Sequence, residues 1–336
     1  MTNSPRHWRR RTGASSSPPR GEGEALNVAE SLRAAAQRLR AGGSRSPRLD
    51  AELLLATALG VDRTALFRAP EVELGVEQAV RFEGYLRRRE AHEPVAYIRG
   101  VRTFRTLDLE VTPAVLIPRP ETETLVDVAL EFVAATTDSA VPEPQILDVG
   151  TGSGCVALAL AAENPTVRVL AVDVDEEALA VARRNAAHHG LTARVSFMRS
   201  DLFAALPSDR RFDVIVSNPP YIPAAEYDAL EPNVRDYEPR LALYGGGDGL
   251  DVYRLLIPAA AARLRPGGGL AVEVGWGEAD AVAALFSATG RFPAVQRRND
   301  LGGLARVVFA RRVDAGSSSM SSRAQEPSAE SPCGEA

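Results

Sequence analysis

Short apolar runs alternate with helical segments from Gln145 onward, and this alternation limits the possible folds more than any other feature of the sequence. Apolar strands that alternate with helices are typical of a mostly parallel sheet with helices on both faces. We therefore expect an α/β domain in this part of the chain. The expected strands are 146–149, 167–172, 195–198, 214–216, 270–274 and 306–309, and the expected helices are 156–162 and 176–188.

The region before the α/β domain has a helical pattern. Apolar residues recur at helical spacing from Leu32 to Leu39, Ser46-Pro47 is typical of a helix start, and Gly60 of a helix end. The expected helices are 32–39, 47–59 and 76–90. Because this region has an apolar face and no catalytic constellation, we expect residues 25–93 to form a small helical domain that docks a substrate.

The pattern changes again between the two domains. Phe104, Leu107, Leu109 and Val111 lie among threonine and acidic residues, which favours extended strands over a helix. We expect residues 94–120 to form a β-hairpin that links the helical domain to the α/β domain.

The composition is that of a globular protein, and it excludes several kinds of chemistry. Hydrophobic residues make up 45% of the 336 residues, and the formal net charge of −5 excludes a chain that coats nucleic acid by bulk charge alone. Every basic residue is arginine, which excludes Schiff-base and P-loop lysines. The 2 cysteines and 4 histidines fall in no metal-ligand spacing, so we expect neither a disulfide framework nor a bound metal.

Both ends of the chain are polar. The first 24 residues are rich in arginine, serine and proline, and they lack the apolar segment of a secretory signal. No stretch approaches the roughly 20 apolar residues of a membrane span. We expect residues 1–24 and 314–336 to be disordered, no membrane partner and a cytoplasmic location, with a transit peptide as the alternative interpretation of the first segment.

A glycine-rich loop, Asp148 to Gly154, follows the first expected strand and precedes a helix. Its glycines allow the backbone to come close to a ligand, and the helix N-terminus adds positive partial charge. Asp173, about 20 residues further on, can accept hydrogen bonds from ribose hydroxyls. The loop fits a nicotinamide cofactor and S-adenosylmethionine about equally, and a structural turn is a third interpretation. Gly152, Gly154 and Ala157 match the looser dinucleotide pattern G-x-G-x-x-A. The absence of a histidine for hydride transfer weighs against a dehydrogenase.

Asp201 and Leu202 follow the third expected strand. An acid at this place can accept a hydrogen bond from the exocyclic amine of adenine, and the leucine can pack on the ring. A solvent-facing acid in a turn is the simpler alternative.

The segment Ser217 to Tyr221, with the sequence Ser-Asn-Pro-Pro-Tyr, ends the fourth expected strand, at the sheet edge where open α/β sheets bind ligands. An amide nitrogen is a poor nucleophile because its lone pair is delocalised. Two acceptors that take its N–H hydrogens can direct that lone pair at an electrophilic methyl group. Asn218 supplies a side-chain carbonyl, Pro219 supplies a backbone carbonyl, and the prolines stiffen the loop. Tyr221 offers an aromatic face to a planar substrate or a cation.

These two motifs resemble those of the S-adenosylmethionine-dependent methyltransferases that modify planar nitrogens. Further stretches narrow the resemblance to the release factor glutamine methyltransferase family. Segments 94–98 and 116–123 look like the linker of that family, 238–250 is similar to the segment after its catalytic motif, and 300–306 is similar to its last hairpin. The resemblance covers roughly residues 49–310.

The resemblance implies a class I methyltransferase domain over residues 121–313, with a Rossmann-like, seven-stranded, mostly parallel sheet. It also implies an enzyme that uses S-adenosyl-L-methionine to methylate the glutamine of the Gly-Gly-Gln motif in class 1 release factors. The implied cofactor-binding residues are Gly150, Thr151, Gly152, Ser153, Gly154, Asp173, Asp201, Leu202 and Asn218. The implied substrate-binding residues are Asn218, Pro219, Pro220 and Tyr221, of which Asn218, Pro219 and Tyr221 are implied to be catalytic.

Three other functions share some of these features. A glutamine methyltransferase that acts on a ribosomal protein is close in chemistry. A DNA adenine methyltransferase would need a target-recognition domain, for which the chain has little room. A non-catalytic module that binds nucleotides disagrees with the intact motif at Asn218. We expect a monomer that does not bind nucleic acid directly.

Overall fold

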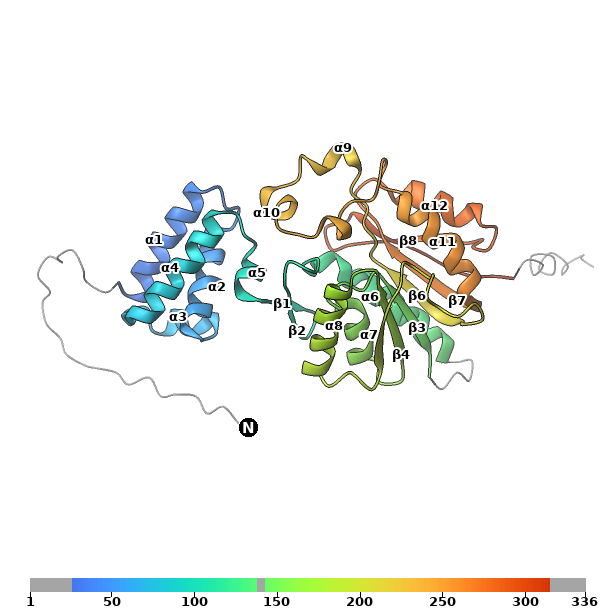
Figure 1. Cartoon of the computed structure of the whole chain (residues 1–336), viewed down its shortest axis with the longest axis horizontal. Helices are drawn as coiled ribbons and strands as arrows, with labels where there is room; N and C mark the ends of the chain where they lie inside the picture. The colour runs from blue at the N-terminus through green and yellow to red at the C-terminus, as the bar shows by residue number, and fades with distance from the viewer. Residues whose placement is uncertain (1–25, 138–142, 315–336) are drawn as a thin grey trace, which may run out of the picture. The chain divides into compact units, whose positions relative to one another are not determined.

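The computed structural model describes residues 26–137 and 143–314, so that almost all of the two predicted disordered tails lies outside the described residues. The chain forms two compact units, residues 1–91 and 92–336. Figure 1 labels the helices and strands of both units.

The first unit is helical, as predicted. Its helices are α1 (Val28–Ala41), α2 (Pro47–Leu59), α3 (Arg63–Arg68) and α4 (Val76–Glu90). Helix α1 begins with a capping box, in which Asn27 accepts from the Glu30 amide at 2.9 Å and Glu30 accepts from the Asn27 amide at 3.2 Å. The short helix α3 was not predicted, although Asp62 caps it by accepting from the Ala65 amide. The largest buried side chains of this unit include Leu39, Leu54, Leu55 and Leu66.

The second unit begins with the segment that was predicted to be a hairpin. Strands β1 (Val101–Phe104) and β2 (Leu107–Glu110) pair in antiparallel register, which confirms the hairpin. The preceding residues are not extended as predicted, because Val95–Arg99 form the short helix α5. The carbonyl of Pro94 accepts from the amides of Tyr97 and Ile98, whose side chains are buried, and Gly100 ends the helix at a φ of +73°.

A seven-stranded sheet forms the centre of the second unit, and it confirms the predicted α/β fold. The strands are β3 (Gln145–Val149), β4 (Arg168–Asp173), β5 (Val195–Arg199), β6 (Phe212–Ser217), β7 (Leu264–Glu273), β8 (Gln296–Asn299) and β9 (Ala305–Arg311). Their order is β5-β4-β3-β6-β7-β9-β8. The first five are parallel, with Ile146 of β3 opposite Val169 of β4 and Val214 of β6, while β9 is antiparallel to both of its neighbours.

Successive residues of a strand point to opposite faces of the sheet. In this sheet the side chains on both faces are apolar, and helices cover both faces. Ile146 and Val214 pack on the side of α6 (Glu123–Thr137) and α7 (Cys155–Glu163). Leu147 and Ile215 pack on the side of α11 (Asp251–Arg263) and α12 (Ala279–Ala288). Figure 1 shows these helices around the strands. The remaining elements are α6 (Glu123–Thr137), α7 (Cys155–Glu163), α8 (Glu176–His188), α9 (Ala224–Tyr227), α10 (Pro232–Arg235), α11 (Asp251–Arg263), α12 (Ala279–Ala288) and two 3-10 turns, Pro120–Thr122 and Arg240–Ala242.

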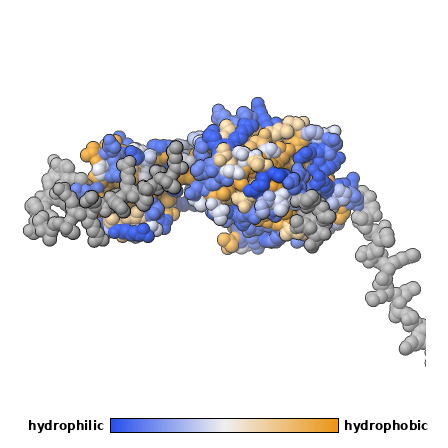
Figure 2. Space-filling view, turned by 90° about the horizontal axis from the view of Figure 1, so that it is seen from below, coloured by the Kyte–Doolittle hydropathy of each residue, from blue (hydrophilic) through white to orange (hydrophobic). Residues whose placement is uncertain are grey.

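On the face shown in Figure 2, apolar residues form groups between hydrophilic residues on both units. Within residues 26–137 and 143–314, no helix has the length and apolar character needed to cross a membrane.

The topology brings the predicted functional segments together. Because β3 to β7 are parallel, the segments that follow them all leave the sheet at one edge. These segments contain the glycine loop, Asp173, Asp201, the Asn218 loop and the turn after Glu273.

Candidate active site

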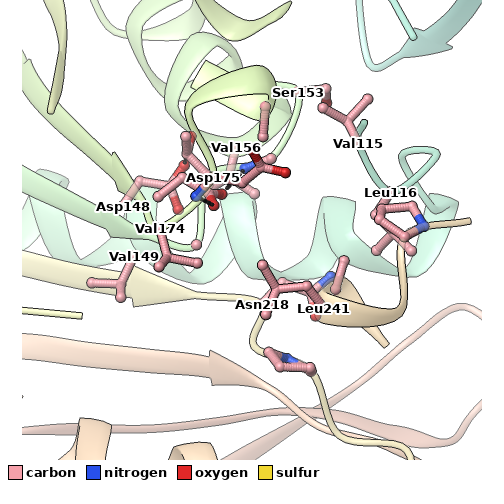
Figure 3. Close-up of a pocket in the computed structure, with 18 of the residues that line it drawn as sticks. Val115, Leu116, Asp148, Val149, Ser153, Val156, Val174, Asp175, Asn218 and Leu241 are labelled. Atoms are coloured by element: carbon pink, nitrogen blue, oxygen red, sulfur yellow. Dashed lines mark hydrogen bonds between the residues drawn. The ribbon is translucent and has the colours of Figure 1, made fainter. Parts of the chain in front are cut away.

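A pocket of about 230 Å³ opens at this edge of the sheet. Residues of the glycine loop, the ends of β4 and β5, and the Asn218 loop line it, together with Ala114, Val115 and Leu116 of the segment after the hairpin. Figure 3 places Asn218 and Leu241 on one side of the pocket and Asp148 and Val149 on another. The sequence patterns did not indicate that the linker residues or Leu241 line this pocket.

The glycine loop has a backbone that other residues rarely adopt. Gly150, Gly152 and Gly154 have φ values of +74°, +55° and +84°. A Cβ at Gly150 or Gly152 would meet no atom within 4 Å, so both glycines leave open space beside the pocket. A Cβ at Gly154 would instead lie 3.2 Å from Leu158. The absence of a Cβ at this position therefore permits close packing of the loop on α7.

Polar groups with few partners lie along this loop. Asp148 is buried, and burial raises its pKa to about 7 although the Thr151 hydroxyl donates to it at 2.7 Å. The buried Oγ of Ser153 has no hydrogen-bond partner of good geometry among the described residues, and Ser153 lines the pocket. A buried hydroxyl with spare hydrogen-bonding capacity beside open space is suited to a polar ligand.

Asp173 lies at the end of β4 and lines the pocket. Its carboxylate accepts from the amides of Gly152 at 2.9 Å and Asp175 at 3.0 Å. Burial raises the pKa of this carboxyl group. Asp173 therefore holds the glycine loop in place, besides any role toward a ligand.

Asp201 and Leu202 also line the pocket. Leu202 has a φ of +46°, which is strained for a residue with a side chain. The buried Ser200 holds the turn, since its hydroxyl accepts from the Ala205 amide at 3.0 Å. Ser200 was not identified from the sequence.

The loop after β6 contains the predicted catalytic residues. Asn218 and Pro220 line the pocket, whereas Pro219 is buried and Tyr221 packs beside Gly275 outside the lining. Burial raises the pKa of Tyr221 to about 12. The Asn218 amide group donates from Nδ2 to Oγ1 of Thr122 at 3.2 Å. This bond turns the Nδ2 end of the amide group toward Thr122, and Oδ1 lies at the other end of the group.

A second segment supports this loop from behind. The amide of Ile222 donates to the Leu243 carbonyl, and the amide of Gly245 donates to the Ile222 carbonyl, both at 2.9 Å. A Cβ at Gly249 would lie 2.5 Å from the Tyr221 carbonyl oxygen, so only glycine fits at position 249 against the backbone of the Asn218 loop. This packing gives a physical reason for the glycine-rich run 245–249.

One wall of the pocket is closed by an ion pair. Arg119 donates to Glu238 at 2.5 Å, and the other oxygen of the buried Glu238 carboxylate accepts from the Ile117 amide at 3.1 Å. The pair joins the segment after the hairpin to the segment that carries Leu241. Within the described ranges, histidine, cysteine and acidic side chains form no group that could hold a metal ion.

Comparison with known proteins agrees with this geometry. Residues 30–100 match the family described as the PrmC N-terminal domain, and residues 122–234 match the methyltransferase small domain. The release factor glutamine methyltransferase of Geobacter sulfurreducens is 47% identical over 80% of this chain and 91% of its own length. The release factor glutamine methyltransferase of Koribacter versatilis is 42% identical over 85% of this chain and 99% of its own length.

The chain belongs to the release factor glutamine methyltransferase family. Among solved structures, the hMettl16 catalytic domain in complex with an RNA hairpin has a TM-score of 0.50 and 15% identity, covering 73% of this chain and 86% of that chain. This likeness concerns the fold alone. Membership of the family makes the chain a methyltransferase that uses S-adenosyl-L-methionine, which decides between the two cofactors that the glycine loop left open.

The residues of the pocket fit this methyl donor. The open space at Gly150 and Gly152 leaves room for a ligand against the backbone, and the Ser153 hydroxyl, which lines the pocket, offers it a polar contact. Asp148 and Asp173 add carboxylates beside a ligand that carries cationic groups and a ribose.

Proposed function

We propose that this enzyme methylates the side-chain amide nitrogen of the glutamine in the Gly-Gly-Gln motif of class 1 release factors. The observation that carries the proposal is the orientation of Asn218, whose Nδ2 is engaged by Thr122 so that Oδ1 remains to accept from an incoming amide. The names of the relatives, which are release factor glutamine methyltransferases, support the same substrate.

The cofactor-binding residues are assigned by the same reasoning. The backbone of Gly150 to Gly154 would hold the methionine part of the cofactor, Asp173 its ribose, and Asp201 with Leu202 its adenine. These assignments agree with the lining of the pocket. When bound, S-adenosyl-L-methionine supplies an electrophilic methyl group on a sulfonium.

The Asn218 loop would act on the substrate. Asn218 Oδ1 and the backbone carbonyl of Pro219 would accept the two N–H hydrogens of the glutamine amide and direct its lone pair toward the methyl group. Pro220 lines the pocket beside them, and the backbone of Tyr221 packs against Gly245 and Gly249, which holds the loop in place. Preorganised acceptors and orientation supply most of the rate in such a site.

The helical unit has a different role in this proposal. We assign residues 25–93 to docking of the release factor, because the residues that line the pocket all lie between Ala114 and Leu255. We further propose that the enzyme acts as a cytoplasmic monomer.

Mass spectrometry tests the substrate. A release factor incubated with the enzyme and S-adenosyl-L-methionine should gain one methyl group on the glutamine of the Gly-Gly-Gln motif. The matched control is a release factor with Glu in place of that glutamine, which should gain none. Methylation of a ribosomal protein or of DNA, with no methylation of the release factor, would overturn the proposal.

A further inference from the structure

Thr122 lies at the end of the 3-10 turn Pro120–Thr122, immediately before α6. It is 1% exposed, and its Oγ1 accepts from Asn218 Nδ2 at 3.2 Å. A buried hydroxyl has one proton to donate, and the direction of that proton determines whether a neighbour must donate to it or accept from it.

Glu273 determines that direction. It ends β7 beside β6, is 1% exposed, and forms a hydrogen bond with the Thr122 hydroxyl. Above about pH 7, Glu273 is mostly a carboxylate and can only accept, so Thr122 gives its proton to Glu273 and has only lone pairs left for Asn218. Oε2 of Glu273 has no hydrogen-bond partner among the described residues.

We propose that Thr122 is a positioning residue for methyl transfer: its hydroxyl, oriented by Glu273, fixes which end of the Asn218 amide faces the substrate. The inference rests on the role proposed above for Asn218. Without the hydroxyl, the Asn218 amide can turn its NH2 group toward the NH2 group of the glutamine. Two donors then face each other, and the substrate nitrogen is no longer held in line.

The test is the substitution Thr122→Val, which keeps the shape of the side chain and removes the hydroxyl. The single-turnover rate at saturating release factor and S-adenosyl-L-methionine should fall roughly 10- to 100-fold, as expected for lost orientation at a reacting centre. The dissociation constant of S-adenosyl-L-methionine, measured by calorimetry, should change less than about twofold because Thr122 is proposed to act through Asn218. Thr122→Ser, which restores the hydroxyl, should recover most of the rate.

A matched control is Thr289→Val at the end of α12, on the opposite edge of the sheet. It removes a hydroxyl that donates to the Phe286 carbonyl at 2.7 Å, and its rate should stay at the parental value. Should Thr122→Val not fold, Thr122→Ala and Thr122→Ser repeat the comparison, since the two variants differ only by the hydroxyl.

Asn218→Ala separates this inference from the proposed function. If Thr122 acts through Asn218, Thr122→Val should slow the Asn218→Ala enzyme much less than it slows the parent. A parental rate for Thr122→Val, an equal loss in Thr122→Ser, or fully additive losses would overturn the positioning role and leave the proposed function intact. A parental rate for Asn218→Ala would instead overturn the site itself.

Discussion

The backbone of Tyr221 lies so close to Gly245 that a Cβ at position 245 would stand 2.7 Å from the Cα of Tyr221. Real Cβ atoms essentially never approach another carbon so closely, and a backbone atom cannot turn aside as a side chain can. The position of the Asn218 loop therefore depends on the absence of one methyl group in the segment that packs against it.

Gly245→Ala should displace the Asn218 loop. Overpacking of a well-packed site costs about 1–3 kcal/mol, so we expect a loss of this size in the free energy of unfolding, measured with urea, together with a large loss of methyl transfer. Gly247→Ala is the matched control in the same run, since a Cβ there would meet no atom within 4 Å. Equal stability and equal methyl transfer in the two variants would show that the loop does not need a glycine at position 245.

Asp173→Ala should weaken cofactor binding for two reasons. It removes the proposed ribose acceptor, and it releases the Gly152 amide, which the carboxylate holds at 2.9 Å. Loss of hydrogen bonds to a charged group costs about 1.5–3 kcal/mol, so calorimetry should show an affinity for S-adenosyl-L-methionine at least about tenfold lower. Asp209→Ala, at an exposed acid, should bind as the parent does. Unchanged affinity in Asp173→Ala would remove Asp173 from the cofactor site.

Ionisation of Glu273 should lower stability as the pH rises. Burial raises the pKa of Glu273 to about 7. The hydrogen bond with Thr122 and the charges of Arg306 and Arg119 oppose the shift, and Glu121 adds to it. The folded state then binds more protons than the unfolded state, in which a glutamate has a pKa of about 4.3. Its stabilising contribution is complete below about pH 4.3 and is lost as the pH rises through about 7.

Glu273→Gln tests this dependence, because glutamine has the same shape and does not titrate. Urea unfolding between pH 5 and 8 should show a smaller loss of stability in this variant, by an amount of the order of 1–3 kcal/mol. Some slope should remain, since burial also raises the pKa of Asp148 and of Glu278 to about 7. The same slope in parent and variant would mean that Glu273 titrates at an ordinary pH.

Exposed apolar residues on α4 should contribute to docking of the release factor. Val76 is 82% exposed and Val80 is 68% exposed, one helical turn apart on the unit that we assign to docking. The double variant Val76→Glu/Val80→Glu should raise KM for the release factor several-fold and leave the affinity for S-adenosyl-L-methionine unchanged. Glu77→Gln on the same helix is the control. A parental KM in the double variant would exclude this face of α4.

The sequence predicted those parts of the site that are contiguous motifs at the ends of apolar strands. The glycine loop, Asp173 and Asn218 belong to this class, because local spacing and the parallel topology together place them at one edge. Strand β8 was missed because its residues, Gln-Arg-Arg-Asn, contain no apolar side chain. Helix α5 was missed because five residues between a proline and a glycine carry too little periodicity.

The partners of these motifs could not be predicted, for a physical reason. Thr122 and Asn218 lie 96 residues apart in the chain, and their hydrogen bond depends on how α6 packs against β6. Glu273 looks like a polar residue at the end of a strand, and its burial follows only from the packing around it. The glycine run at 245–249 could be matched to a family, but its close contact with Tyr221 is a tertiary property.

The single-turnover rate of Asn218 variants, measured with a release factor substrate, tests the central claim most directly. Asn218→Ala removes the acceptor and should slow methyl transfer by roughly 10²–10³-fold with little loss of cofactor affinity. Asn218→Asp keeps an acceptor oxygen and the size of the side chain, but its negative charge stabilises a cationic sulfonium more than the charge-dispersed transition state. It should bind S-adenosyl-L-methionine at least as well as the parent and turn over at least about tenfold more slowly. Near-parental rates in both variants would contradict the account and make Asn218 a structural residue of the loop.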